Sequence, residues 1–206
     1  MPTILFILML CLFALSSCAG FQHRCDSSIS PDCLKAERLW QKSIDSIVSK
    51  NFPAEFGTFK AVIWEDSNHN AWVTKGTEIN ITRPFLHKLN NIEKKCVVAH
   101  ELAHLKMGHY YAKKGIIILD DREGGRKRES PVGHYGQTLN IEVPKGFGED
   151  QEKEADRLAL AYLERAGINK RIYLNLLTRI RTGSSVPGPN IIERIQHIRK
   201  IIFGRK

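Results

Sequence analysis

Two histidines and a glutamate stand at a spacing that could hold a metal ion and use it for hydrolysis. They are His100, Glu101 and His104, in the pattern H-E-x-x-H. On a helix, residues i and i+4 lie on one face about one turn apart, so both imidazoles could reach a single ion. Glu101 would project beside them, where its carboxylate could take a proton from a metal-bound water. The pattern predicts metal-assisted hydrolysis, on condition that a helix, a third ligand and supporting residues exist.

The third ligand and a supporting carboxylate are predicted to come from residues 152–156. Catalytic zinc usually takes three protein ligands and keeps one position for water. Glu152 and Asp156 are i and i+4 on a second predicted helix, and thus lie on one face. We assign Glu152 to the metal and Asp156 to the free N–H of a ligand histidine, in the first place His100. Glu154 points roughly 200° away around this helix and is predicted to face solvent.

This set of residues predicts one Zn²⁺ and a definite division of roles. Zinc would lower the pKa of its bound water to about 7. Glu101 would take the proton as hydroxide attacks a peptide carbonyl, and would pass it to the leaving amine. A further cation or donor would be needed for the oxyanion. The alternative is an ordinary helix whose two histidines are partly buried, and the spacing of Glu152 and Asp156 favours the metal site.

The helices that must position these residues carry clear start and stop signals. Asn90 with Glu93 three residues later forms an approximate capping box before the H-E-x-x-H segment. Apolar residues then recur on one face, and Gly108 is the first weak point. A second helix is predicted over 149–166, ended by Gly167. Three more are predicted to start at Ser30, Asn169 and Asn190, and a short one after Pro84.

Three strand-like stretches lie between the first helix and the H-E-x-x-H helix. They are residues 59–65, 71–74 and 78–82, separated by turn-rich segments. We expect them to form a small antiparallel sheet. At 206 residues and 42% hydrophobic content, the chain can bury one sizeable core. The predicted fold class is α+β, mainly helical, with one domain over residues 31–206.

The N-terminus is predicted to be an export signal followed by a tether. Residues 1–15 are almost purely apolar and too short for a membrane span, although no basic residue precedes them, and the signal peptide is predicted to be residues 1–17. Leu15-Ser16-Ser17-Cys18 resembles a bacterial lipobox, which implies cleavage before Cys18 and a lipid anchor on it. With Ala19 next, the resemblance implies sorting to the outer membrane as a periplasmic lipoprotein. The alternative is an ordinary cleaved signal with a chance cysteine. Residues 18–30 would form the tether.

Charge and cysteine content limit the classes of binding partner and the cellular compartment that we expect. The formal net charge is +9, but no run has the spacing of a known nucleic-acid module. An exported protein is a poor candidate for nucleic-acid binding, whereas a tethered basic protein could rest on anionic headgroups. Cys25 and Cys33 are close enough in sequence to pair in an oxidising compartment. Cys96 lies among apolar residues and is predicted to be a buried thiol.

The order of these motifs resembles a known family. It is similar to that of the HtpX-like and CAAX-prenyl-endopeptidase family of zinc metallopeptidases (peptidase family M48, gluzincins), over about Phe59 to Ile198. The resemblance rests on His100-Glu101-Leu102-Ala103-His104, then Gly108-His109, then Glu152-x-x-Ala155-Asp156. It implies a compact zincin-like fold and an endopeptidase that cuts extended or misfolded envelope proteins. His109 is expected to be a surface residue or to support a ligand.

Two further matches extend the resemblance, and one position departs from it. Asn70-Ala71-Trp72 resembles the start of the family's edge strand, which pairs with extended substrate. Pro189 with Glu193-Arg194-Ile195 resembles the C-terminal signature, whose arginine lies near the metal. This makes Arg194 the candidate for the oxyanion. Many members have a histidine where this chain has Gly188, which implies a zinc position open to water.

Two functional hypotheses remain open from the sequence. The first is the zinc endopeptidase, and the second is an envelope chaperone or assembly factor that keeps a zinc site with little turnover. The intact Glu101 favours the enzyme, because a structural zinc site needs no general base. Residues 120–150 lack clear periodicity and hold a cluster of basic residues. Because they separate the two metal-site helices, they could overhang the cleft.

Overall fold

The computed structural model describes residues 23–109, 147–183 and 190–204. Its helices are α2 (Pro31–Asn51), α3 (Arg83–Lys88), α4 (Asn91–Lys106), α6 (Glu149–Arg165), α7 (Lys170–Gly183) and α8 (Ile191–Phe203), with a 3₁₀ turn η1 (Pro53–Glu55). Its strands are β1 (His23–Arg24), β2 (Lys60–Glu65), β3 (Ala71–Thr74) and β4 (Glu78–Thr82). The predicted α+β, mainly helical fold class is confirmed. Within these residues, no helix combines the length and the apolar character needed to cross a bilayer.

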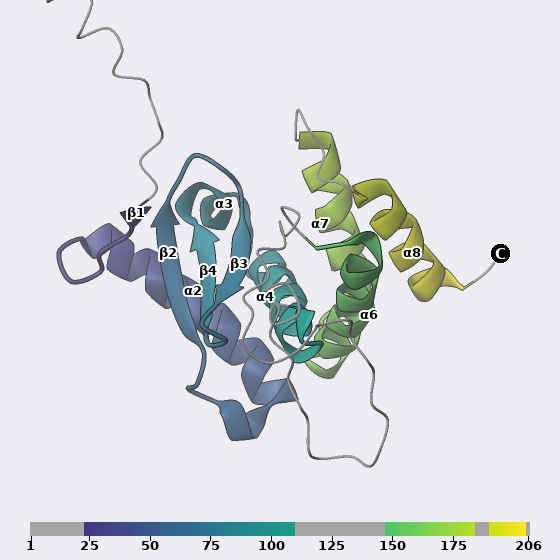
Figure 1. Ribbon diagram of the computed structural model, residues 1–206, viewed down its shortest axis with the longest axis horizontal. Coiled ribbons are helices and arrows are strands. Elements are labelled where there is room, and N and C mark those ends of the chain that lie inside the picture. The colour runs from purple at the N-terminus through teal and green to yellow at the C-terminus, as the bar shows by residue number, and fades with distance from the viewer. Residues whose placement is uncertain (1–22, 110–146, 184–189, 205–206) are drawn as a thin grey trace, which may run out of the picture.

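Helix α4 lies at the centre of the molecule. In Figure 1 the sheet and α2 lie on one side of it, and α6, α7 and α8 on the other. It contacts α2, β3, α6 and α7. The face that carries the H-E-x-x-H residues is therefore enclosed by the helices that follow it in sequence. The capping box is present, since Asn90 Oδ1 accepts from Glu93 N and the Glu93 side chain accepts from Asn90 N.

The sheet is mixed, so the prediction of an antiparallel sheet was wrong in one pairing. The strand order is β1-β2-β4-β3, with β2 and β4 parallel and β3 and β4 antiparallel. β3 and β4 form a tight hairpin, in which Lys75 and Gly76 both adopt positive φ. β4 then lies between β3 and β2, which leaves β3 at the edge. Strand propensity identifies each strand but does not say which neighbour it pairs with.

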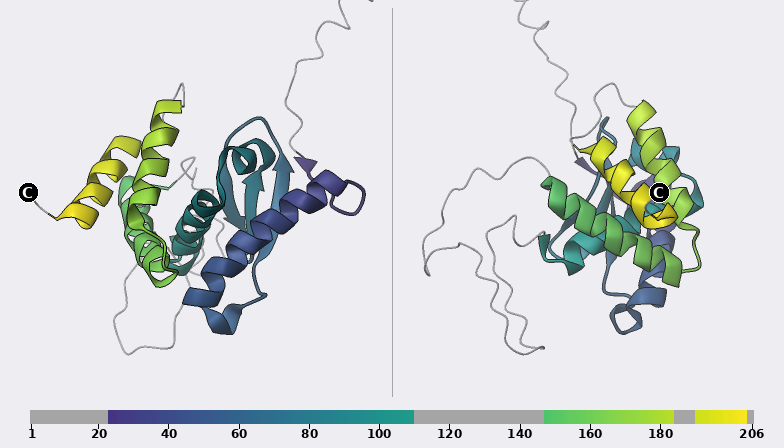
Figure 2. Two further views of the ribbon diagram at one scale, coloured as in Figure 1. Left: turned by 180° about the vertical axis from the view of Figure 1, so that it is seen from behind. Right: turned by 90° about the vertical axis from the view of Figure 1, so that its right-hand side faces the viewer.

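Helix α2 covers one face of this sheet, as Figure 2 shows from behind. Ser30 caps the helix by accepting from Cys33 N, with Pro31 at its first turn. The buried Trp40 donates its indole N–H to Ile79 O at 2.9 Å. Gln41 accepts from Ala61 N at 2.8 Å. These bonds fix α2 to the strands beside the apolar core.

Part of the segment predicted as a tether is joined to the folded domain. β1 pairs antiparallel with β2, with His23 opposite Glu65 and Arg24 opposite Trp64. Cys25 and Cys33 form a disulfide that ties this strand to the first turn of α2. The predicted signal peptide, Cys18 and the start of the tether lie outside the described residues. Cys96 is a buried thiol, as predicted, and burial raises its pKa to about 12.

Candidate metal centre

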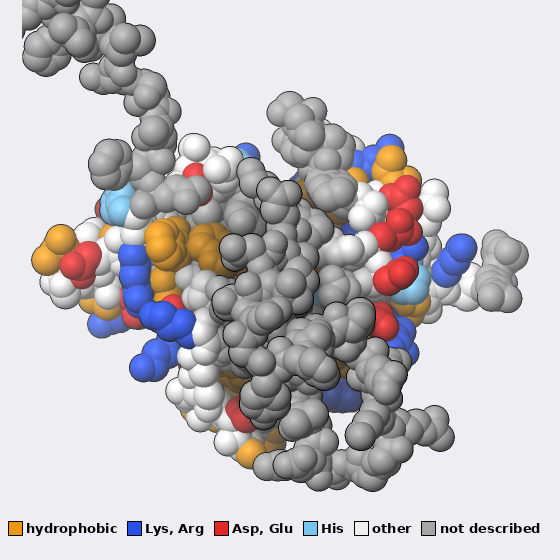
Figure 3. Space-filling view, in the orientation of Figure 1, with side chains coloured by type: hydrophobic (Ala, Val, Ile, Leu, Met, Phe, Trp, Pro, Cys, Tyr) orange, Lys and Arg blue, Asp and Glu red, His pale blue; other side chains and the backbone are white. Residues whose placement is uncertain are grey.

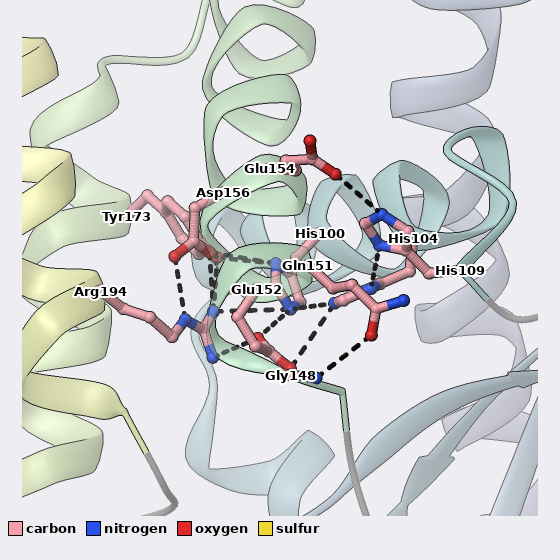
Figure 4. Close-up of polar contacts among 10 residues, drawn as sticks. All are labelled: His100, His104, His109, Gly148, Gln151, Glu152, Glu154, Asp156, Tyr173 and Arg194. Atoms are coloured by element: carbon pink, nitrogen blue, oxygen red, sulfur yellow. Dashed lines mark hydrogen bonds and ion pairs between the residues drawn. The ribbon is translucent and has the colours of Figure 1, made fainter. Parts of the chain in front are cut away.

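Helices α4 and α6 bring His100, His104 and Glu152 together, as Figure 4 shows. Nε2 of His100 lies 3.1 Å from Nε2 of His104 and 3.3 Å from Glu152 Oε2. One ligand atom from each of the three residues falls within 4.8 Å of the other two. Two atoms bound to one tetrahedral zinc at about 2.0–2.1 Å would lie about 3.3 Å apart. The spacing therefore fits one ion.

The excess of buried carboxylates over positively charged side chains at the site also fits a divalent cation. Glu152 Oε2 is buried and accepts no well-directed hydrogen bond, although Arg194 Nη1 lies 2.7 Å away as an ion-pair partner. Glu101 and Asp156 add two further buried carboxylates against this single guanidinium. Two imidazoles and a carboxylate are the donor set of catalytic zinc. His100, His104 and Glu152 could therefore hold a metal, as the sequence predicted.

In both histidines, Nδ1 points away from the three converging atoms and makes a polar contact with another side chain. Nδ1 of His100 lies 3.2 Å from Asp156 Oδ1 and 3.0 Å from the Tyr173 hydroxyl. Nδ1 of His104 lies 3.0 Å from Nδ1 of His109. A metal-binding histidine commonly donates its other N–H to such a partner, which fixes the ring and its tautomer. The structure thus places Asp156 beside His100, where the sequence had assigned it.

Arg194 joins the two carboxylates of α6 from the side of α8. Its Nε and Nη2 donate to Asp156 Oδ2 and Oδ1 at 2.9 and 2.7 Å, and Nη1 pairs with Glu152. Nη2 also donates to the Tyr173 hydroxyl at 3.2 Å. Most donors of the guanidinium are therefore engaged in positioning these side chains. The structure brings Arg194 to the site, and its use on an oxyanion remains a prediction.

The three carboxyl groups at the site differ in pKa. Burial acts to raise the pKa of Glu152, but the neighbouring His100 and His104 and the charge of Arg194 hold it well below its usual range. The pKa of Asp156 is likewise lowered by His100 and Arg194 despite burial. Burial raises the pKa of Glu101 to about 7. A carboxyl group with a pKa near neutrality suits a general base.

Tyr173 is the site residue that the sequence did not identify. It lies on α7, is almost fully buried, and donates its hydroxyl to Asp156 Oδ1 at 2.6 Å. Its neighbours Ile172, Leu176 and Leu177 recur at helical spacing and form an apolar stripe. A tyrosine within such a stripe needs a partner for its hydroxyl, and this was the signal that could have found it.

His109 and Glu154 meet next to His104. Helix α4 ends at Lys106, and Gly108 adopts φ +72°, which turns the chain so that His109 folds back. His109 is 5% exposed, and its Nε2 lies 3.3 Å from Glu154 Oε2. Glu154, predicted to face solvent, is 43% exposed and still reaches this ring. Phe147 stacks on His104 with ring centroids 3.9 Å apart.

Gly108→Ala is expected to destabilise the protein by about 1 kcal/mol. A Cβ at Gly108 would meet nothing within 4 Å, so the cost is backbone strain at positive φ and not a clash. Urea denaturation would measure it. Gly167→Ala is the matched comparison, since Gly167 has φ +70° and equally open surroundings after α6. Unchanged stability at Gly108 together with a loss at Gly167 would contradict this account of the helix end.

The predicted substrate strand, β3, lies at one edge of the sheet that the described residues form. β3 pairs with β4 on one side, with Trp72 opposite Asn80, and contacts α4. Asn70 precedes the strand and donates its N–H to Thr82 Oγ1. Alternation along the strands places Trp64 and Trp72 on the face opposite α2, with ring centroids 5.8 Å apart. Hydrophobic side chains are visible on this face in Figure 3. Residues 110–146, Gly188 and Pro189 lie outside the described residues.

Comparison with known proteins accords with this site. The chain is 24% identical over 161 residues to the metalloprotease YcaL of Escherichia coli (strain K12). The match covers 70% of this chain and 62% of that protein, so the chain spans about three-fifths of the relative's length. The model of peptidase family M48 matches residues 34–202, which include both metal-site helices and Arg194. With the larger part of its length matched, the chain belongs to peptidase family M48.

Proposed function

We propose that this protein is a zinc-dependent endopeptidase that hydrolyses peptide bonds in extended or misfolded proteins. The observation that carries the proposal is the convergence of His100, His104 and Glu152 on one point, with Glu101 next to it in sequence. Membership of peptidase family M48 supports the reaction class. Zinc is the metal that this donor set suits best.

The buried polar residues around the point of convergence would divide the reaction between them. A bound zinc would polarise the scissile carbonyl and acidify the attacking water. Glu101 would accept a proton from that water and deliver it to the leaving amine. His100, His104 and Glu152 would hold the metal, with Asp156 and Tyr173 fixing the His100 ring. Arg194 would keep the two α6 carboxylates in position, and its remaining donor capacity could face the oxyanion.

The place of β3 at the edge of the sheet, as far as the described residues form it, supports an extended substrate. An exposed strand edge can pair with a peptide through backbone hydrogen bonds, which need no particular side-chain sequence. β3 contacts α4, the helix that carries Glu101. A peptide paired with residues 70–72 would therefore run beside the metal centre. This mode of binding selects for unfolded segments, because a folded protein does not offer a free strand.

The metal requirement can be tested with Glu152→Ala. Loss of a ligand should weaken zinc binding by more than about 100-fold, since changes behind the ligands already cost 10–100-fold. Metal analysis after dialysis measures this, with chelator-sensitive cleavage of an unfolded protein followed in parallel. Glu164→Ala, on an exposed part of the same helix, is the control and should keep the metal. Full zinc occupancy in Glu152→Ala would refute its role as third ligand.

We further propose that the protein is an envelope lipoprotein, anchored through Cys18. The lipobox-like Leu15-Ser16-Ser17-Cys18 supports this, and an envelope location would place the enzyme among misfolded exported proteins. The Cys25–Cys33 disulfide suits an oxidising compartment. Mass spectrometry of the mature N-terminus is expected to find a lipid-modified Cys18. An unmodified Cys18 would refute the anchor and leave the peptidase proposal intact.

A further inference from the structure

The two ligand histidines are supported in different ways. Nδ1 of His100 reaches the fully buried carboxylate of Asp156 directly. Nδ1 of His104 reaches no carboxylate in the described part of the chain; it faces another imidazole nitrogen, Nδ1 of His109, at 3.0 Å. Nε2 of His109 in turn lies 3.3 Å from Glu154 Oε2. Figure 4 shows this run of contacts from α6 through His109 to His104.

Glu154, at the end of this series of contacts, determines which ring nitrogens of His109 and His104 carry a proton. An ionised carboxylate only accepts hydrogen bonds, so Glu154 requires an N–H at Nε2 of His109. In the neutral ring, Nδ1 of His109 is then an acceptor. It can be satisfied only if His104 carries its proton on Nδ1. The lone pair of His104 is thereby left on Nε2, the atom that lies 3.1 Å from His100 Nε2 in the ligand cluster.

We propose that His109 is a positioning residue that sets the tautomer of His104, and that Glu154 holds His109 in the required orientation. The consequence for metal binding rests on the proposed function, whereas the tautomer assignment does not. His109 is not a ligand in this scheme, because its Nδ1 faces the side of His104 that is turned away from the cluster. Phe147, stacked on His104, limits rotation of the ligand ring from one face.

The end of helix α4 explains why a residue five positions after His104 can do this. On a continuous helix, a residue at i+5 would point about 140° away from residue i. The positive φ of Gly108 ends the helix and turns His109 back against His104 instead. The buried position of His109 keeps water from replacing the contact. Glu154, being 43% exposed, can be replaced in part by water.

The tautomers can be measured directly in the metal-free wild-type protein. Long-range ¹H–¹⁵N correlation spectra of the histidine rings distinguish a proton on Nδ1 from one on Nε2. We expect neutral His104 to carry its proton on Nδ1, and His109 on Nε2. The reverse assignment in either ring would overturn the proposal. Because no metal is involved, this result is independent of whether the protein is a zinc peptidase.

Substitutions then test the consequence for the metal. His109→Leu removes the acceptor and is expected to weaken zinc binding 10–100-fold in competition with a chelator. His109→Asn places an amide oxygen near the former Nδ1 and should recover most of that loss. The absorption spectrum of the cobalt-substituted protein should change in His109→Leu and return towards wild type in His109→Asn. Equal zinc affinity in all three proteins would overturn the proposal, whereas a wild type that binds no zinc would refute the proposed function instead.

Glu154→Ala tests whether Glu154 holds His109 in the required orientation, with Glu149→Ala as its matched control. Both glutamates lie on α6, and their side chains are 43% and 42% exposed. We expect Glu154→Ala to weaken zinc binding several-fold, and Glu149→Ala to leave it unchanged. Circular dichroism and urea denaturation establish that each variant is folded. Should His109→Leu not fold, the wild-type tautomers and Glu154→Ala still decide the question. Equal affinities of the two glutamate variants would remove Glu154 from the scheme.

Discussion

Glu101→Gln is expected to lower kcat/KM for an unfolded protein substrate by about 10²–10⁴, the usual contribution of a general base. The substitution keeps the size of the side chain and removes its ability to accept a proton. Glu101 is 8% exposed, so bulk water cannot easily take over its role. Zinc content should be unchanged, because Glu101 is not among the three residues whose atoms converge. Metal analysis and proteolysis of the same preparation measure both.

Glu93→Gln is the control on the same helix. Its amide oxygen can still accept from Asn90 N in the capping box, and only the ion pair with Arg179 is lost. Activity should therefore remain near that of the wild type. If Glu101→Gln kept more than about a tenth of the activity, Glu101 would not be the base. If the wild type bound zinc and cleaved no unfolded protein, the chaperone or assembly hypothesis would gain.

The helices could be predicted from the sequence because their signals are local. Two helices begin at caps formed within a few residues, Ser30 with Pro31 and Asn90 with Glu93. Helix α6 ends in the same local way, at Gly167. At Asn190 the local rule misled in part: a helix begins there, but Asn190 adopts φ +66° and makes no side-chain cap. A residue type that favours a helix start does not determine how the chain enters it.

The pairing of the strands could not be predicted in the same way. The hairpin of β3 and β4 follows from a short loop, whereas the parallel pairing of β2 and β4 depends on where the whole hairpin packs. The docking of β1 was missed for a related reason. His23–Arg24 is too short to carry a strand pattern. The disulfide beside it joins Cys25 to Cys33, eight positions later in the sequence, and folding must first bring the two together.

The residues of the site likewise fall into two groups, those that local spacing predicts and those that only the packing of the fold brings together. His100, His104 and Glu152 could be found because two helical spacings, i and i+4, project them from single faces. Tyr173 and His109 reach the site through contacts with other parts of the fold. No spacing links Tyr173 to Asp156, and the contact of His109 requires the chain reversal at Gly108. The candidate ligands are therefore predictable from periodicity, whereas the residues that would orient them depend on packing.

Asp156→Leu is expected to destabilise the metal-free protein by about 3–5 kcal/mol. Asp156 is fully buried and accepts from Tyr173, and twice from Arg194. Its loss would leave the guanidinium buried with Glu152 as its remaining carboxylate partner. Urea denaturation in the presence of a chelator would measure the change without a contribution from metal binding. A loss below about 1 kcal/mol would contradict the view that this pair supports the fold.

Combining Asp156→Leu with Arg194→Met separates support of the fold from support of the site. The double variant should be more stable than the sum of the single losses predicts, by about 1–3 kcal/mol, because it removes the uncompensated buried charge. Zinc affinity should not recover with it, since His100 would still lack the carboxylate that orients its ring. Recovery of both properties would mean that Asp156 acts only by neutralising Arg194. Recovery of stability alone would mean that Asp156 has two separable roles, one towards the guanidinium of α8 and one towards the histidine of α4.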